Sequence, residues 1–114
     1  MEIDELREDE LFIVECLRKF HFLYGHGYAP SELFLFGRGE YSITFNNHML
    51  SRKIEIIEKE GLGLDIIFIQ KSFFGIKTTE LSKIAKFKRP PASLKTLAEL
   101  VQSDYMYLIN PRSA

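Results

Sequence analysis

Three β-type segments between residues 40 and 70 constrain the fold of this chain more than any other feature. Residues 41–46 alternate apolar and polar side chains, and residues 53–56 do the same, which is the period-2 pattern of strands with one buried face. Residues 64–69 are apolar at every position except Asp65, which favours a central strand covered on both faces. Because turn residues separate the three segments by short connections, the sequence predicts an antiparallel meander of three to four strands.

The segment before these strands is expected to be helical. Its apolar residues recur every three or four positions from Ile3 to Tyr24, and acidic residues crowd its first turns, as the helix dipole favours. Gly25 or Gly27 is the expected C-cap of this helix. The apolar run 33–36 follows, and the sequence leaves open whether that run forms a separate strand.

Two further helices are predicted after the strands. Phe73-Phe74-Gly75 is expected to close the sheet, and Thr79 is expected to cap a helix that reaches about Phe87. Ser93 is the expected N-cap of the last helix, which should end at Asn110-Pro111 because proline cannot continue a helix.

Segregated runs of helices and strands predict the α+β class. The expected order is an N-terminal helix, the meander, and two C-terminal helices packed mainly on one sheet face. The chain has 114 residues, so residues 1–114 are expected to form a single domain with its own core. A hydrophobic content of 46% fits a globular chain and argues against disorder.

The composition also favours a cytoplasmic protein with no membrane partner. The longest apolar run is far shorter than the roughly 18 residues that a membrane span requires. The acidic N-terminal stretch lacks the basic n-region of a signal peptide. The single cysteine, Cys16, cannot form an intramolecular disulfide, as expected in a reducing compartment.

The net charge of −1 conceals an asymmetry along the chain. Residues 1–15 hold one base, Arg7, and a group of acids: Glu2, Asp4, Glu5, Glu8, Asp9, Glu10 and Glu15. Residues 77–95 hold one acid, Glu80, and a group of bases: Lys77, Lys83, Lys86, Lys88, Arg89 and Lys95. The two regions are therefore oppositely charged, which bears on the charge of any partner.

The sequence contains no recognisable catalytic or metal-binding motif. His21 and His26 are five residues apart across an expected helix end, and Cys16 lies in mid-helix, so these residues lack the spacing that directs ligands at one metal. No Gly-x-Ser-x-Gly elbow is present to hold a nucleophile, and the paired glycines at 37–39 and 61–63 lack the Lys-Ser/Thr of a phosphate loop. We therefore expect no catalytic residue, no metal site and no cofactor.

Two alternative hypotheses follow from individual residues. A small enzyme could use His26, which lies between two glycines, together with Asp65, which lies in the most apolar strand. A nucleic-acid-associated protein could use the basic segment 83–95, with Phe87 stacked on a base. The slightly acidic net charge and the absence of further aromatic residues in that segment argue against a nucleic-acid partner.

Four short stretches carry a resemblance to a known class of proteins. They are Phe-His-Phe-Leu-Tyr-Gly-His-Gly-Tyr at 20–28, Tyr-Ser-Ile-Thr-Phe-Asn at 41–46, Ile-Glu-Ile at 54–56 and Leu-Asp-Ile-Ile-Phe at 64–68. Their layout resembles small bacterial immunity proteins, the antidotes encoded beside polymorphic and contact-dependent growth inhibition toxins. The resemblance implies a cytoplasmic, non-enzymatic protein that binds one toxin domain, often a nuclease, and blocks its active site or substrate surface.

A nuclease presents positive charge to phosphates, so acids of the N-terminal region would steer the encounter with such a toxin domain. Tyrosines would serve as anchors, because tyrosine combines apolar area with a hydroxyl, although each of them could equally belong to the core of the protein itself. The partner-binding candidates are Glu5, Glu8, Asp9, Glu10, Tyr24, Tyr28 and Tyr41.

Overall fold

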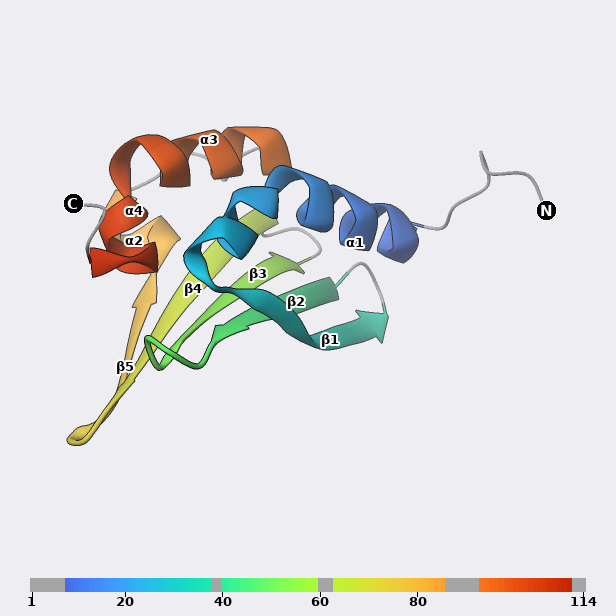
Figure 1. The fold of residues 1–114 in the computed structure, drawn as a ribbon. Coiled ribbons are helices and arrows are strands. Elements are labelled where there is room, and N and C mark those ends of the chain that lie inside the picture. The colour runs from blue at the N-terminus through green and yellow to red at the C-terminus, as the bar shows by residue number, and fades with distance from the viewer. Residues whose placement is uncertain (1–7, 38–39, 60–62, 86–92, 112–114) are drawn as a thin grey trace.

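A computed structural model of the protein describes residues 8–37, 40–59, 63–85 and 93–111. The chain forms an α+β fold in which a five-stranded antiparallel sheet carries its helices on one face (Figure 1). The strands follow each other in space in the same order as in the sequence, and they are β1 (Ala29–Gly37), β2 (Glu40–Asn47), β3 (Arg52–Lys59), β4 (Gly63–Ser72) and β5 (Gly75–Glu80).

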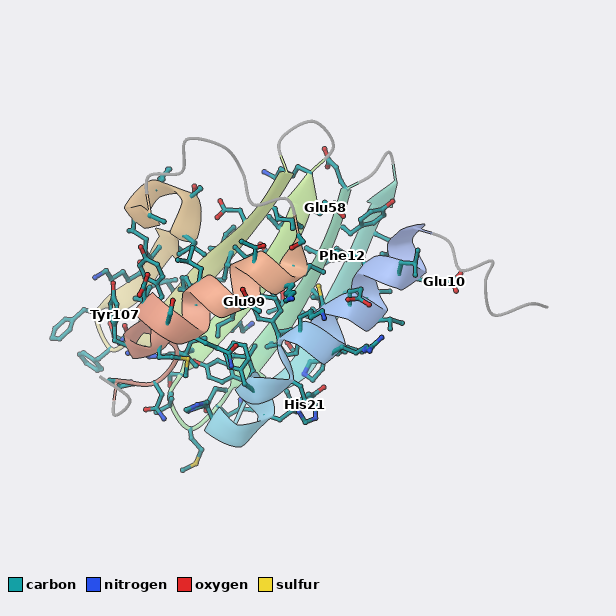
Figure 2. All side chains as sticks on the ribbon, turned by 90° about the horizontal axis from the view of Figure 1, so that it is seen from above. Glu10, Phe12, His21, Glu58, Glu99 and Tyr107 are labelled. Carbon is teal, nitrogen blue, oxygen red and sulfur yellow. The ribbon has the colours of Figure 1, made fainter. Side chains whose placement is uncertain are left out.

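Helices occur on both sides of the meander in the sequence. The helix α1 (Glu8–Lys19) continues into the 3-10 helix η2 (His21–His26) before the first strand. The short helix α2 (Leu81–Ala85) follows β5, and α3 (Leu94–Asp104) and α4 (Met106–Ile109) complete the described chain. Viewed from the helix side, α1 and α3 lie next to each other across the strands (Figure 2).

The core lies between the sheet and this helix layer. Partners in an antiparallel pair point to the same side of a sheet. The pairing of Ile43 with Ile56, and of Ile56 with Ile66, therefore places a continuous apolar row toward the helices. Phe12 of α1 meets this layer, where its ring lies 5.5 Å from that of Tyr41. The core also includes Cys16, Phe20, Leu23, Leu97 and Val101, which are buried.

The structure corrects the predicted end of the meander. Phe73-Phe74 does not close the sheet but forms the turn of a β4–β5 hairpin, so there are five strands rather than three to four. Thr79 lies inside β5 and does not cap a helix, because α2 begins at Leu81. The expected helix end at Phe87 lies outside the described residues. Ile76, Thr78 and Thr79 are β-branched and therefore suit a strand. The strand was not predicted because it is short and directly follows the turn.

Two other expectations were wrong in part. β4 was expected to be covered on both faces, yet its buried side chains alternate with half-buried ones, because the helices cover a single face. The predicted N-terminal helix ends at Lys19 and gives way to a 3-10 segment, while residues 3–7 of the prediction lie outside the described chain.

Several local predictions are confirmed. The run 33–36, which the sequence left undecided, belongs to a separate strand, β1. Gly27 has φ +90° and ends η2 in the left-handed conformation that favours glycine. The Ser93 hydroxyl accepts a hydrogen bond from the Thr96 amide at 3.2 Å and caps α3 as predicted.

The C-terminal turn is held by side chains from the first half of the chain. Arg52 donates from Nη1 to the Leu108 carbonyl at 2.7 Å and to the Tyr107 carbonyl at 3.3 Å. The Tyr28 hydroxyl donates to the Ile109 carbonyl at 2.5 Å. These carbonyls at the end of α4 have no partner within the helix, and a cation there also suits the helix dipole. The C-terminal turn is thereby tied to the segment before β1 and to the start of β3.

Removing the Tyr28 hydroxyl should destabilise the protein. We expect Tyr28→Phe to lower the free energy of unfolding by about 1–3 kcal/mol, because the Ile109 carbonyl stays buried and loses its donor. Tyr107→Phe is the matched control, since Tyr107 is half exposed, and it should change the free energy by less than about 0.5 kcal/mol. Urea denaturation measures both free energies of unfolding. Equal effects of the two substitutions would contradict a stabilising role for the Tyr28 hydrogen bond.

The burial of the Tyr28 hydroxyl also gives the stability a pH dependence. Burial raises the pKa of Tyr28 from 10.0 to about 12, so the folded state keeps the hydroxyl protonated where the unfolded chain loses its proton. The contribution of Tyr28 is complete below pH 10.0 and is lost as the pH rises toward about 12. The stability difference between the wild type and Tyr28→Phe should therefore shrink when denaturation is repeated between those two pH values.

Candidate functional site

The three tyrosines proposed as partner anchors occupy different environments. Tyr28 is 2% exposed and Tyr41 is 9% exposed, and both belong to the core. Tyr24 is 40% exposed and lies in a shallow surface depression with Leu17, Arg18 and His21. Of the three, Tyr24 alone presents a large part of its side chain to a partner.

The acids proposed to steer a partner are placed only in part. Glu5 lies outside the described residues, and Glu8, Asp9 and Glu10 form the first turn of α1. Glu10 is half-buried, and Figure 2 places it at the start of the helix. Acids at this position also suit the dipole of α1, so a structural role accounts for their placement as well as steering does.

His26 and Asp65, the pair considered for an enzyme site, do not meet. The Asn47 side chain donates to the His26 carbonyl at 2.8 Å, whereas Asp65 stands opposite Ile57, which pairs with Ser42. Five residues of β2 separate Asn47 from Ser42, or about 17 Å at about 3.4 Å per residue. The two side chains therefore cannot act on one substrate atom.

Each of these residues has a local structural role. Asp65 accepts hydrogen bonds from the Ser82 amide at 2.9 Å and from the Ser82 hydroxyl at 2.6 Å, which ties α2 to the edge of the sheet. His26 has a contact of 3.4 Å from its Nδ1 to Asn110 Nδ2. Asp65 is thus a partnered carboxylate, as a half-buried acid requires.

The remaining candidate groups do not converge. Burial raises the pKa of the Cys16 thiol well above its ordinary value, with Glu58 and Glu15 adding to the shift, so the thiol stays protonated and unreactive. Within the described part of the chain, no group of three or more His, Cys, Asp or Glu residues could hold a metal ion. Of the basic segment, Lys83 pairs with Glu80 at 3.5 Å, Lys95 is exposed, and residues 86–92 lie outside the described chain.

The sheet face opposite the helices offers a more coherent surface, which we call the uncovered face. The helices α1 and α3 lie over the other face (Figure 1), and the described contact of a helix with this face is that of α2, whose Ser82 donates to Asp65. Its central row crosses all five strands by direct pairing and consists of Glu32, Thr44, Glu55, Ile67 and Glu80. Thr44 is 4% exposed, so the accessible part of this row lies on the strands beside β2. The half-buried apolar side chains beside this row come from neighbouring positions and are Ile57 and Ile69.

Glu55 is the unusual residue of the uncovered face. Burial raises the pKa of its carboxyl group, the charge of Glu32 raises it further, and Lys59 lowers it. Glu32 has a partner in Lys53 at 3.8 Å, and Glu80 has one in Lys83 at 3.5 Å. Among the described residues, Glu55 has neither a hydrogen bond nor an ion pair. A half-buried carboxylate in this condition would gain from a cation supplied by another molecule.

Ser42 lies next to Glu55 on the same face and is also unusual. It is 0% exposed, and its hydroxyl has no hydrogen-bond partner in the described part of the chain. Sequence analysis recognised Ser42 and Glu55 as polar positions but missed their importance. The alternation of polar and apolar residues in the sequence shows which face each residue occupies. Its neighbours on adjacent strands depend on the strand register, which the sequence pattern does not give.

Comparison of the chain with protein-family models, with curated proteins and with solved structures found no match. No helix within the described ranges is long and apolar enough to cross a membrane.

Neutralising Glu55 should stabilise the isolated protein. Its pKa is raised in the folded state, so the ionised form disfavours folding, and this penalty grows as the pH rises through the folded pKa. We expect Glu55→Gln to raise the thermal midpoint by about 1–3 °C at neutral pH, a small gain because the carboxylate is partly solvated. The gain should vanish on acidification below 4.5, the ordinary pKa.

The exposed Glu99 of α3 provides the control (Figure 2). Glu99→Gln should leave the thermal midpoint nearly unchanged, because exposed charge changes usually have small effects. Differential scanning calorimetry at several pH values separates the two variants. A destabilised Glu55→Gln protein at neutral pH would show that the carboxylate has a favourable partner and is not a strained group.

Proposed function

We propose that this protein is a non-enzymatic binding protein that neutralises a basic toxin domain, such as a nuclease, by direct contact through its uncovered face. The observation that carries the proposal is the half-buried Glu55 carboxylate, which has no hydrogen bond or ion pair among the described residues on the sheet face opposite α1 and α3. The resemblance of residues 20–70 to immunity proteins supports the same function.

The chemistry of the uncovered face suits a basic protein partner. Ile57, Ile67 and Ile69 lie around Glu55 and provide apolar area that a partner would remove from water. An arginine from the partner could form a bidentate pair with Glu55, and the apolar surroundings would strengthen that bond.

The environment of Glu55 disfavours its ionised form in the free protein, which suggests that the carboxylate serves binding and not folding. A glutamine there would fold more easily, so the ionised glutamate favours a complex at the expense of the free protein. Acids of the first turn of α1 would act at longer range, because charges outside the contact surface mainly affect the rate of association. The proposal thus assigns affinity to the uncovered face and steering to Glu8, Asp9 and Glu10.

The experiment uses the toxin domain encoded beside this protein's own gene. Growth of cells that express the toxin is measured together with the wild type or with Glu55→Lys, and binding is measured by calorimetry with an inactivated toxin. We expect the wild type to restore growth, and Glu55→Lys to lose at least about tenfold in affinity, because a cation would then face a cation. Glu55→Gln should also bind more weakly while folding more stably.

Glu99→Lys is the control for the change of charge itself. Glu99 is exposed on α3, over the opposite face of the sheet, so its reversal should leave affinity within about threefold of the wild type. Equal losses for the two reversals would mean that only the overall charge matters. Full neutralisation by Glu55→Lys would place the contact surface elsewhere, and a toxin that binds neither protein would contradict the proposed function.

A further inference from the structure

The tip of the β4–β5 hairpin is the most exposed apolar region of the described chain. Phe73 is 98% exposed and Phe74 is 95% exposed, and Ile76, just after the turn, is 67% exposed. The hairpin extends away from the body of the protein, with this turn at its far end (Figure 1). An exposed apolar region of this kind commonly marks a site of interaction with a protein or a membrane, so the position of the two phenylalanines points to a partner.

The turn holds these side chains in an ordered arrangement. The Phe74 amide donates to the Ser72 hydroxyl at 3.3 Å, and that hydroxyl donates to the Gly75 carbonyl at 3.3 Å. Gly75 has φ +132°, a conformation that other residues rarely adopt. The rings of Phe73 and Phe74 meet edge to face with centroids 5.5 Å apart. The aromatic pair is therefore prepared for contact before any partner arrives.

Positive charge surrounds the base of this tip. Residues 66–79 contain two lysines, Lys71 and Lys77, and no acid, although the net charge of the chain is −1. Lys71 pairs with Ile76 and Lys77 pairs with Gln70, so the two lysines point to opposite sides of the hairpin. Neither ammonium group forms an ion pair with any residue that the structure describes. Both are available to an anionic partner.

We propose that this tip inserts into the surface of an anionic lipid bilayer. Phe73 and Phe74 would enter the boundary between headgroups and acyl chains, and the two lysines would contact anionic headgroups from either side. Lys71 lies two residues before Phe73, or about 7 Å along the strand, which matches the depth of about 5–10 Å to which interfacial elements insert. A convex aromatic tip with cations on both sides complements a flat surface that is anionic outside and apolar within.

This membrane contact goes beyond the proposed function and uses a different part of the molecule. The sequence-based expectation of no membrane partner rests on the absence of a spanning segment, and a hairpin tip requires no such segment. Two aromatic side chains and two lysines give weak, reversible binding, with each lysine contributing about fivefold to the partition coefficient. The uncovered face stays outside the bilayer and accessible to a protein.

The chain contains no tryptophan, so a single substitution provides a site-specific fluorescent probe. Phe74→Trp places the probe at the tip, and Met49→Trp places one in the β2–β3 turn, where Met49 is 93% exposed. Each protein is mixed with vesicles of phosphatidylcholine alone or of equal parts phosphatidylglycerol and phosphatidylcholine, with and without brominated acyl chains. We expect a blue shift and bromine quenching for Phe74→Trp with the anionic vesicles only, and neither change for Met49→Trp.

Co-sedimentation of unlabelled variants tests the two chemical contributions separately. Phe73→Ser with Phe74→Ser should abolish binding to anionic vesicles, and Lys71→Gln with Lys77→Gln should weaken binding about 25-fold. The charge-matched control, Lys59→Gln with Lys95→Gln, removes two exposed lysines elsewhere and should bind nearly as the wild type does. The altered tip residues are exposed, so circular dichroism should show an unchanged fold for every variant.

Three results would overturn the proposal. The first is an absence of wild-type binding to anionic vesicles at low salt. The second is equal binding to neutral and anionic vesicles, which would remove the role of the lysines. The third is a wild type that binds no vesicle but self-associates in analytical ultracentrifugation until Phe73 and Phe74 are replaced by serine, which would identify the tip as a contact between copies of the chain. None of these results depends on the toxin.

Discussion

Each central strand sends alternate side chains to the two faces of the sheet, and the helices α1 and α3 cover only one of those faces. Ile43, Ile56 and Ile66 form the row that the helices bury, and α1 and α3 pack over that side. Burial of this row drives the helices onto the sheet, because apolar area removed from water is the main favourable term in folding. The same alternation leaves Glu55 and its neighbours on the other face.

Hydrogen bonds from side chains in the first half of the chain to the C-terminal turn close the helix layer. Tyr28 follows η2 and Arg52 begins β3, yet both donate to carbonyls at the end of α4. They fix the last turn over the end of the sheet where β2 meets β3. Both proposed contact regions, the uncovered face and the β4–β5 tip, lie outside this closed layer. Stability and binding are therefore assigned to different parts of one small protein.

The local features of the fold could be predicted from the sequence because they depend on neighbouring residues. The alternation in β2 and β3, the Ser93 cap and the Gly27 helix end all involve positions within a few residues of each other. β5 was missed because Phe73-Phe74-Gly75 was expected to close the sheet and Thr79 to cap a helix, whereas the structure exposes both phenylalanines at a turn and places Thr79 in the strand. Hydrophobicity favours burial but does not require it.

The site residues were harder to predict because they depend on register and on long-range packing. Tyr28 and Tyr41 carry the same side chain as Tyr24, and only the helix layer distinguishes the two buried rings from the exposed one. Glu55 was recognised as a polar strand position, but its closeness to Glu32 depends on two successive strand pairings. A one-residue shift in either pairing would have sent the side chains to opposite faces.

Isoleucine methyl NMR tests most directly the claim that the two faces of the sheet have different roles. Isoleucines occur on both faces, so one labelled sample reports on each when the inactivated toxin domain is added. The account predicts shifted and broadened methyl signals from the uncovered face, namely Ile57, Ile67 and Ile69. It predicts little change for the buried methyls under the helices, namely Ile43, Ile54, Ile56 and Ile66. Changes confined to Ile13 and Ile84, with no change at Ile57, Ile67 or Ile69, would contradict the account.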